Sequence, residues 1–453
     1  MSNNFRDADR LTPYLLPPSI NEWLPEKHLA RFVVEVVSQL DLTSLKAAYS
    51  GRGSKAYSPA VLLSLLFYGY ATGVFSSRKL ERCTYDSVAF RYVCANEHPD
   101  HDTIASFRKR FLGEIKELFV QILQIARQMN VFKLGKVSLD GTKIHANASK
   151  HQALSWKYAC ELEKMLKEEV ARLIRLAEEA DANDIPDGMD IPEELNHRET
   201  RLKAIAEAKA EIERRASEKY AEAKREHERK LAERKAKEKE SGKKSSGKKP
   251  AEPKSEPDDK DQVNLTDSES RIMPLSGGGF EQSYNAQACV DIDSMLIVEN
   301  HITQNANDKK EIEPALKNLT SLPKSLGKVE ALLADAGYFS KSNVELCLEE
   351  RIQPYISTNR DKHNLTLEQR FPKQLEPISP CADVVAQMTH RMKTSEGSAL
   401  YAKRKQTVEP VFGIIKSAMG FRQFLLRGLK SVEGEWNLVC MAWNIKKMYV
   451  LGL

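Results

Sequence analysis

Three acidic residues spread along the chain, Asp140, Asp335 and Glu409, have the side-chain type that binds hard divalent cations. Mg²⁺ takes oxygen ligands at about 2.0–2.1 Å, and three carboxylates brought together can hold a pair of ions roughly 3.5–4 Å apart. Such a pair supports chemistry at a phosphate, because one ion activates a nucleophilic oxygen and the other stabilises the leaving oxygen. Three carboxylates at this range repel one another, so their convergence favours catalysis over a structural role.

The sequence around the two aspartates predicts strands. Apolar and polar residues alternate over 136–140, which predicts a strand that ends at Asp140 before the turn signal Gly141-Thr142. The mostly apolar run 329–334 predicts a buried strand that delivers Asp335 to its C-terminal end. Two parallel neighbouring strands can bring both side chains to one end of a sheet.

A helix is predicted over 407–419, where Glu409 and Lys416 return to nearly the same face, so this helix can project Glu409 toward the aspartates. Other patterns predict strands at 284–290, 295–302 and 352–357 and helices at 309–319, from Ser340 or Ser342, and through 436–449.

Residues 1–130 are predicted to be helical. The expected helices are 28–40, 61–70 after the Ser58-Pro59 start signal, 79–93 after Ser76 or Ser77, and 103–129 with Asp102 as its N-cap. Arg108, Lys109 and Arg110 lie on the second helix of a helix, loop and helix arrangement that suits a DNA-reading helix-turn-helix. A helical bundle with a basic surface is an equal alternative.

A long insertion separates the two aspartates. Within 153–262, apolar residues recur at steps of three or four over 162–177 and predict one helix, and a second helix is predicted through 195–212 after a Pro/Asp-rich break at 185–192. Residues 241–257 have the composition of a disordered segment. This predicts a helical hairpin with a disordered basic end. Asp140 and Asp335 are 195 residues apart, and without the 110 residues of the insertion the spacing is 85.

Composition excludes several classes of protein. The chain has 29% charged residues, a mean hydropathy of −0.50 and no apolar run of about 18 residues, which excludes a membrane transporter. The first 30 residues lack the apolar core of a secretory signal, and seven scattered cysteines favour neither disulfides nor a structural zinc site. We expect a reduced, cytoplasmic protein that makes no membrane contact.

The positive charge is concentrated in one segment. The net charge is +5, but 224–249 holds twelve Lys/Arg against five Glu, so the remainder sums to −2. This segment could contact nucleic acid, although a solvated helix face that leads into a disordered tail is the plainer interpretation.

Four segments, 138–148, Tyr284-Asn285-Ala286-Gln287, 334–338 and 408–413, resemble bacterial insertion-sequence DDE transposases with an InsH-type N-terminal helical domain. The order of the predicted elements also resembles the RNase H-like fold of these enzymes. The resemblance implies an α/β RNase H-like catalytic domain with a mixed sheet at 131–152 and 263–453. It also implies an all-α N-terminal DNA-binding domain at 1–130 and a charged helical hairpin insertion at 153–262.

The resemblance also implies a function. Asp140, Asp335 and Glu409 would bind two Mg²⁺ ions, with Mn²⁺ as a possible substitute, and would catalyse cleavage of double-stranded DNA at terminal inverted repeats. The freed ends would then be joined to target DNA by a homodimer in a synaptic complex, in the bacterial cytoplasm at the nucleoid. Two alternatives stay open: a nuclease of the same fold without strand transfer, and a non-enzymatic DNA-binding or coiled-coil scaffold.

Many such enzymes carry Tyr, two residues, Arg, three residues, Glu, six residues and Lys. Here Glu409 and Lys416 keep the last spacing, but Tyr401 and Arg404 lie one residue too far upstream, and Lys405 occupies the strict Arg position. We expect Lys416 to contact phosphate, with Arg404 and Lys405 as competing candidates for the same role. A solvent-facing basic helix is the structural alternative for all three.

Other polar groups are weaker candidates. The segment 96–102 contains His and Asp but favours a loop and a helix cap over a metal site, and 51–55 lacks the spacing of a phosphate-binding loop. His145 and Asp308 are expected to lie near enough to support the site, with hydrogen bonding to neighbours as the safer role for both.

Overall fold

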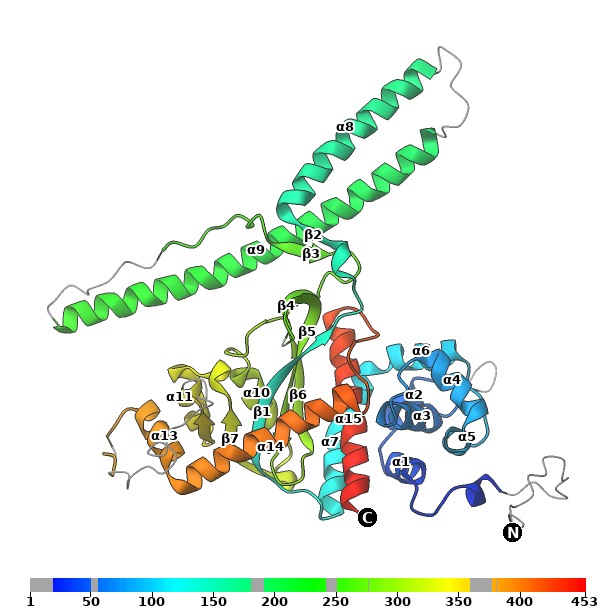
Figure 1. Cartoon of the computed structure of the whole chain (residues 1–453), viewed down its shortest axis with the longest axis vertical. Coiled ribbons are helices and arrows are strands. Elements are labelled where there is room, and N and C mark those ends of the chain that lie inside the picture. Colours follow the sequence, from blue (N-terminus) through cyan, green and yellow to red (C-terminus); the bar gives the residue numbers. More distant parts are fainter. Residues whose placement is uncertain are drawn as a thin grey trace, which may run out of the picture.

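The computed structural model describes the chain at residues 19–49, 56–180, 191–241, 251–275, 277–358, 377–379 and 381–453. A six-stranded sheet lies beside a group of short helices, and a long helical arm projects away from both (Figure 1). The rejected phosphate loop at 51–55, most of the predicted break at 185–192 and residues 242–250 of the predicted disordered end lie outside the described residues.

Strand β1 forms the middle of the sheet. It is antiparallel to β5 on one side and parallel to β7 on the other; β8 is parallel to β7, and β4 and β6 both pair with β5. The strands are β1 (Leu134–His145), β4 (Arg271–Pro274), β5 (Phe280–Asp291), β6 (Ile297–Thr303), β7 (Gly327–Ala334) and β8 (Gln353–Ile356). The predicted mixed sheet is therefore confirmed, with shifted strand ends.

The predicted strand end at Asp140 is wrong, because β1 continues to His145. Gly141 pairs with Gln287 of β5, and the ladder runs on to His145 opposite Ser283. A Gly-Thr pair is a turn signal only locally, and here the long partner strand keeps it extended. Asp140 still lies just beyond the parallel ladder, since the last β1–β7 pair is Ser138 with Leu333.

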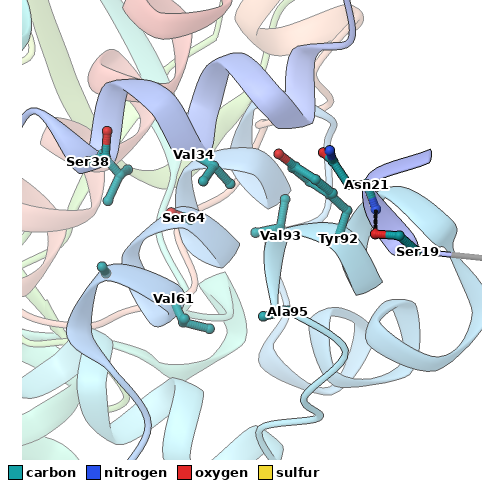
Figure 2. A pocket seen from close by; sticks show the side chains of 11 residues that line it. Ser19, Asn21, Val34, Ser38, Val61, Ser64, Tyr92, Val93 and Ala95 are labelled. Carbon is teal, nitrogen blue, oxygen red and sulfur yellow. Dashed lines mark hydrogen bonds between the residues drawn. The ribbon is translucent and has the colours of Figure 1, made fainter. Parts of the chain in front are cut away.

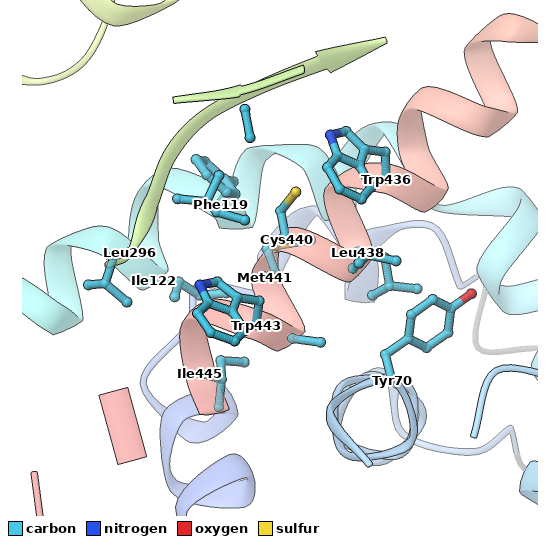
Figure 3. Packing of buried hydrophobic residues seen from close by; sticks show 14 of the residues in the cluster. Tyr70, Phe119, Ile122, Leu296, Trp436, Leu438, Cys440, Met441, Trp443 and Ile445 are labelled. Atoms are coloured by element: carbon cyan, nitrogen blue, oxygen red, sulfur yellow. The ribbon is translucent and has the colours of Figure 1, made fainter. Parts of the chain in front are cut away.

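Two long helices, α14 (Ser395–Ser417) and α15 (Leu429–Leu451), pack on the sheet, α14 against β1 and β5 and α15 against β6. Figure 3 shows Trp436 and Trp443 of α15 packed near Phe119 of α7 (Leu112–Gln128). The indole Nε1 of Trp436 donates to the Gln287 carbonyl at 3.0 Å, which ties α15 to β5. The shorter helices of this part are α10 (Ile312–Thr320), α11 (Lys341–Glu349) and α13 (Val384–Lys393).

The N-terminal helices share one hydrophobic cluster with the sheet, which runs from Leu24 to Met448. The predicted boundary near residue 130 thus coincides with a change from helix to strand and does not divide this cluster. The helices are α1 (Leu29–Ser38), α2 (Thr43–Ala47), α3 (Pro59–Ala71), α4 (Ser77–Asp86), α5 (Val88–Val93) and α6 (His101–Arg110).

Two predicted N-terminal helices are broken. The predicted helix 79–93 divides at Ser87, which is extended, and the predicted helix 103–129 divides at Phe111. Phe111 is buried against Tyr49 and Phe107, so tertiary packing outweighs helix propensity there. The N-cap of α6 is Asp100 rather than Asp102, because the Asp100 carboxylate accepts from the Thr103 N–H at 2.8 Å.

The inserted residues form a helical arm, which we define as β2 (Ala153–Ser155), α8 (Trp156–Ala180), α9 (Ile191–Ser241) and β3 (Gln262–Asn264). The antiparallel β2–β3 pair forms its base, and α8 and α9 share a small hydrophobic cluster of their own (Figure 1). The two predicted helices of the insertion are confirmed.

A test of helix length and hydropathy over the described residues finds no single helix able to cross a membrane, although Pro59–Thr72 and Ser77–Asp86, bent by 96°, pass together.

Candidate active site

Strand pairing places Asp140 and Asp335 at the same end of neighbouring parallel strands. Ser138 pairs with Leu333, so each aspartate follows its paired residue by two positions. Asp335 comes directly after β7 and begins the short 3-10 helix η4 (Ala336–Tyr338). Its Oδ1 accepts from the Gly337 N–H at 2.8 Å, which fixes the direction of the carboxylate.

Arg404 of α14 joins the third acid to this strand end. Its Nη1 lies 3.4 Å from Asp140 Oδ2, and its Nη2 lies 3.2 Å from Glu409 Oε1. Arg404 is only 7% exposed, whereas Lys405 is exposed on the same helix. Of the two competing basic residues, the structure therefore brings Arg404 to the acids.

The surroundings of Asp140 disfavour its charged form. Burial raises the pKa of Asp140 to about 7, and the nearby carboxylates of Asp335 and Asp308 act in the same direction. The Gly141 N–H and Arg404 oppose this shift. Burial by itself would lower the pKa of Arg404, but Asp140 and other neighbouring groups raise it overall, so the guanidinium is held in its charged form.

The donor chemistry at this site fits a divalent cation. Asp140, Asp335 and Glu409 offer carboxylate oxygens, and the raised pKa of Asp140 reflects mainly its burial, to which the charges of Asp335 and Asp308 add. Among the described residues, no group of three or more His, Cys, Asp or Glu side chains is arranged so that it could hold a metal ion. Arg404 instead forms ion pairs with Asp140 and Glu409.

The remaining DNA-binding candidates lie in different surroundings. Lys416 Nζ donates to the Lys143 carbonyl at 2.8 Å, which fastens α14 to β1. Burial, together with the charge of Lys143, lowers the pKa of Lys416. Lys109 and Arg110 are exposed at the end of α6, although Arg110 also donates to the Ala48 carbonyl at 2.7 Å.

Arg108 requires a correction. Its side chain is buried and donates to the Tyr70 hydroxyl at 2.9 Å and to the Phe75 carbonyl at 3.0 Å. Buried Glu435 accepts from the same Tyr70 hydroxyl at 3.2 Å. Because the Arg108 guanidinium is buried and donates to groups in the core, we remove Arg108 from the candidate DNA-binding residues.

Polar side chains of β5 that sequence reasoning left without a role lie beside the aspartates. Asn285 and Gln287 are fully buried and donate to Asp308 at 2.6 and 2.7 Å. Polar residues two apart on a strand that is otherwise buried were the signal that could have identified them. Asp308 thus lies near the site as expected, whereas the His145 backbone pairs with the segment before α15, at Arg422 and Phe424.

Two other features, the segment 96–102 and a pocket among the N-terminal helices, contain none of the candidate catalytic residues. The segment 96–102 is a loop and helix cap as predicted, with His98 Nδ1 3.0 Å from Thr84 Oγ1 and His101 Nδ1 2.7 Å from Glu81 Oε2. A pocket of about 540 Å³ among the N-terminal helices contains none of the candidate residues (Figure 2). No acidic or basic side chain lines it.

Comparison with known families gives two matches. Residues 18–110 match a family described as a transposase domain (DUF772), and residues 362–449 match one described as a transposase DDE domain. The second match includes Arg404 and Glu409 but neither aspartate. No curated protein and no solved structure matches the chain significantly.

Proposed function

We propose that the chain is a DDE transposase of the insertion-sequence type, because residues 18–110 and 362–449 both match transposase domains. Such enzymes depend on divalent metal ions. We assign Asp140, Asp335 and Glu409 as the ligands of these ions. The observation that carries the assignment is the contact of Arg404 with both Asp140 and Glu409, on a sheet whose pairing sets Asp335 beside Asp140.

The fold we assign to the sheet is RNase H-like. The strand order β6-β5-β1-β7-β8, antiparallel over the first three strands and parallel over the last three, supports this assignment. The catalytic domain is then 131–152 with 263–453, preceded by a DNA-binding domain at 1–130 and interrupted by the insertion at 153–262.

The proposed reaction is strand cleavage at terminal inverted repeats followed by strand transfer to target DNA. Two Mg²⁺ ions, or Mn²⁺ in their place, would supply activation of the attacking oxygen and stabilisation of the leaving oxygen. Asp140 and Asp335 hold their carboxylates in fixed directions through backbone N–H groups, which limits the reorganisation needed on binding. Arg404 supplies positive charge between Asp140 and Glu409.

Basic side chains account for the DNA contacts. Lys109 and Arg110 at the end of α6 and Lys405 on α14 are exposed and can reach phosphates. Arg404 is paired with Asp140, and Lys416 donates to the Lys143 carbonyl, so each would contact the phosphate only by exchanging the partner that it holds here. Because two element ends must be joined in one event, the active assembly is at least a homodimer.

A strand-transfer assay tests this function. The protein is incubated with Mg²⁺ and either intact element ends, which report cleavage, or precut element ends and a target plasmid, which report joining; cleaved and joined products are both expected. Asp335→Asn should lower cleavage at least about 1000-fold, equivalent to about 4 kcal/mol, while DNA binding survives. The matched control is Glu330→Gln, which changes an exposed acid of the same strand and should leave the rate unchanged.

The outcomes separate the alternatives. Cleaved but never joined DNA would identify a nuclease without strand transfer. Full activity of Asp335→Asn would refute the assignment of the metal ligands.

A further inference from the structure

The segment Tyr284-Asn285-Ala286-Gln287 carries two amide side chains that the proposed cleavage chemistry does not use. Asn285 Nδ2 and Gln287 Nε2 both donate to Oδ1 of Asp308, at 2.6 and 2.7 Å. Lys143 Nζ lies 3.5 Å from the same oxygen. Both amide residues are 0% exposed, and buried amides are costly unless hydrogen-bonded, so these contacts constrain where the three side chains can lie.

The same side chains enclose the backbone of Gly141, which follows Asp140. A Cβ at Gly141 would lie 2.2 Å from Gln287 Nε2 and 2.7 Å from Asp308 Oδ1, so any larger residue would displace these side chains. The Gly141 N–H donates to Asp140 Oδ1 at 2.8 Å. The position of this peptide group therefore sets the direction of the Asp140 carboxylate.

The network continues to the second aspartate. Gln287 Oε1 accepts from the Tyr338 hydroxyl, and Tyr338 is fully buried at the end of η4, the turn that begins after Asp335. The Gly337 N–H of this turn donates to Asp335 Oδ1. Asn343 Nδ2 holds the turn from its other side, since it donates to the Tyr338 carbonyl at 2.7 Å.

We propose that Asn285, Gln287 and Asp308 form a clamp that positions both aspartate carboxylates for metal binding. They are positioning residues, because they contact the peptide segments that orient the aspartates. The inference rests on the proposed function, in which Asp140 and Asp335 are metal ligands. Partners that orient metal ligands typically contribute about 10-fold to 100-fold in metal affinity.

Mn²⁺ binding to the full chain without DNA tests the clamp, with free Mn²⁺ measured by electron paramagnetic resonance. Asp308→Ala should weaken Mn²⁺ binding about 10-fold or more and lower kcat for end cleavage, with KM for DNA unchanged. Asp308→Asn keeps an acceptor oxygen for both amides and should retain most of the affinity. Gly141→Ala, which displaces the clamp without removing any of its groups, should also weaken binding.

The matched control is Asn444→Ser. It removes two buried hydrogen bonds to Ile297, of 2.8 and 2.7 Å, in a part of the sheet apart from the aspartates. It should lower Tm and leave Mn²⁺ affinity unchanged. Equal losses of affinity in Asn444→Ser and Asp308→Ala would overturn the clamp, and so would wild-type affinity in Asp308→Ala or in Gly141→Ala.

Asp140→Asn, measured in the same way, separates the two proposals. If it leaves Mn²⁺ binding intact, the proposed metal site is wrong. If it abolishes binding while Asp308→Ala does not weaken it, the metal site stands and the clamp alone is refuted.

Discussion

Asp140 in the central sheet and Glu163 in the helical arm are carboxylates with opposite surroundings. Burial, reinforced by Asp335, raises the pKa of Asp140 to about 7. Hydrogen bonds from Lys167 and Lys209, each 2.6 Å long, lower the pKa of Glu163 to about 2. Folding thus disfavours the negative charge of Asp140 in the sheet, whereas it favours the negative charge of Glu163 in the arm.

The difference follows from how each region is built. Lys167 is one helical turn from Glu163, and Lys209 faces it from α9, so the arm pairs its charges through helix geometry. The sheet buries Asp140 and places Asp335 and Asp308 near it, so burial and like charge both disfavour its ionised form. Strain of this electrostatic kind is expected at functional sites and not in a connecting arm.

Of the changes considered, removal of the Asp140 charge should have the largest effect on folding stability. Because the folded pKa of about 7 exceeds the ordinary 3.8, the native state binds a proton that the unfolded state releases, so metal-free stability falls as pH rises from about 4 to about 7. At pH 8, Asp140→Asn should therefore be more stable than the wild type by roughly 4 kcal/mol and unfold at a higher temperature. Near pH 4 the two proteins should unfold at the same temperature.

Thermal unfolding in EDTA across this pH range measures the effect. Asp293→Asn, which changes an exposed acid, is the control and should follow the wild type. A constant difference between Asp140→Asn and the wild type at every pH would show that the Asp140 charge is not destabilising.

Removal of the Glu163 charge should act in the opposite direction and more weakly. Its folded pKa lies below the ordinary 4.5, so the stabilisation is present above about pH 4.5 and is lost as pH falls toward 2. Since solvent screens the partly exposed pairs, Glu163→Gln should cost about 1 kcal/mol at pH 7. Denaturant unfolding in low and high salt checks this, because added salt should shrink the difference.

Deletion of the arm should affect the sheet least. Ser155 pairs with Gln262 at the base of the arm, so an Asn-Gly turn can replace residues 156–261. The shortened chain loses the separate cluster of α8 and α9 but keeps the whole main cluster. We expect Tm to change by only a few degrees and Mn²⁺ affinity to stay at the wild-type value; loss of Mn²⁺ binding would show that the arm supports the site.

Helix α14 shows where sequence reasoning stops. Its pattern identified a helix with Glu409, but spacing alone left Arg404 and Lys405 as equal candidates. The choice depends on which side chain faces β1, a strand 264 residues away in sequence at Asp140. The prediction that Arg108 contacts DNA was wrong for the same reason, since its partner Tyr70 belongs to another helix.

By itself the sequence determined the strands that lead to Asp140 and Asp335 and the helical arm, because periodicity and local motifs encode these directly, and it proposed the three acids. The tertiary structure decided that β1 continues past Asp140, that Arg404 joins the acids and that Asn285, Gln287 and Asp308 surround Gly141. These features depend on strand register and on hydrogen bonds between distant segments, for which no local pattern supplies the geometry.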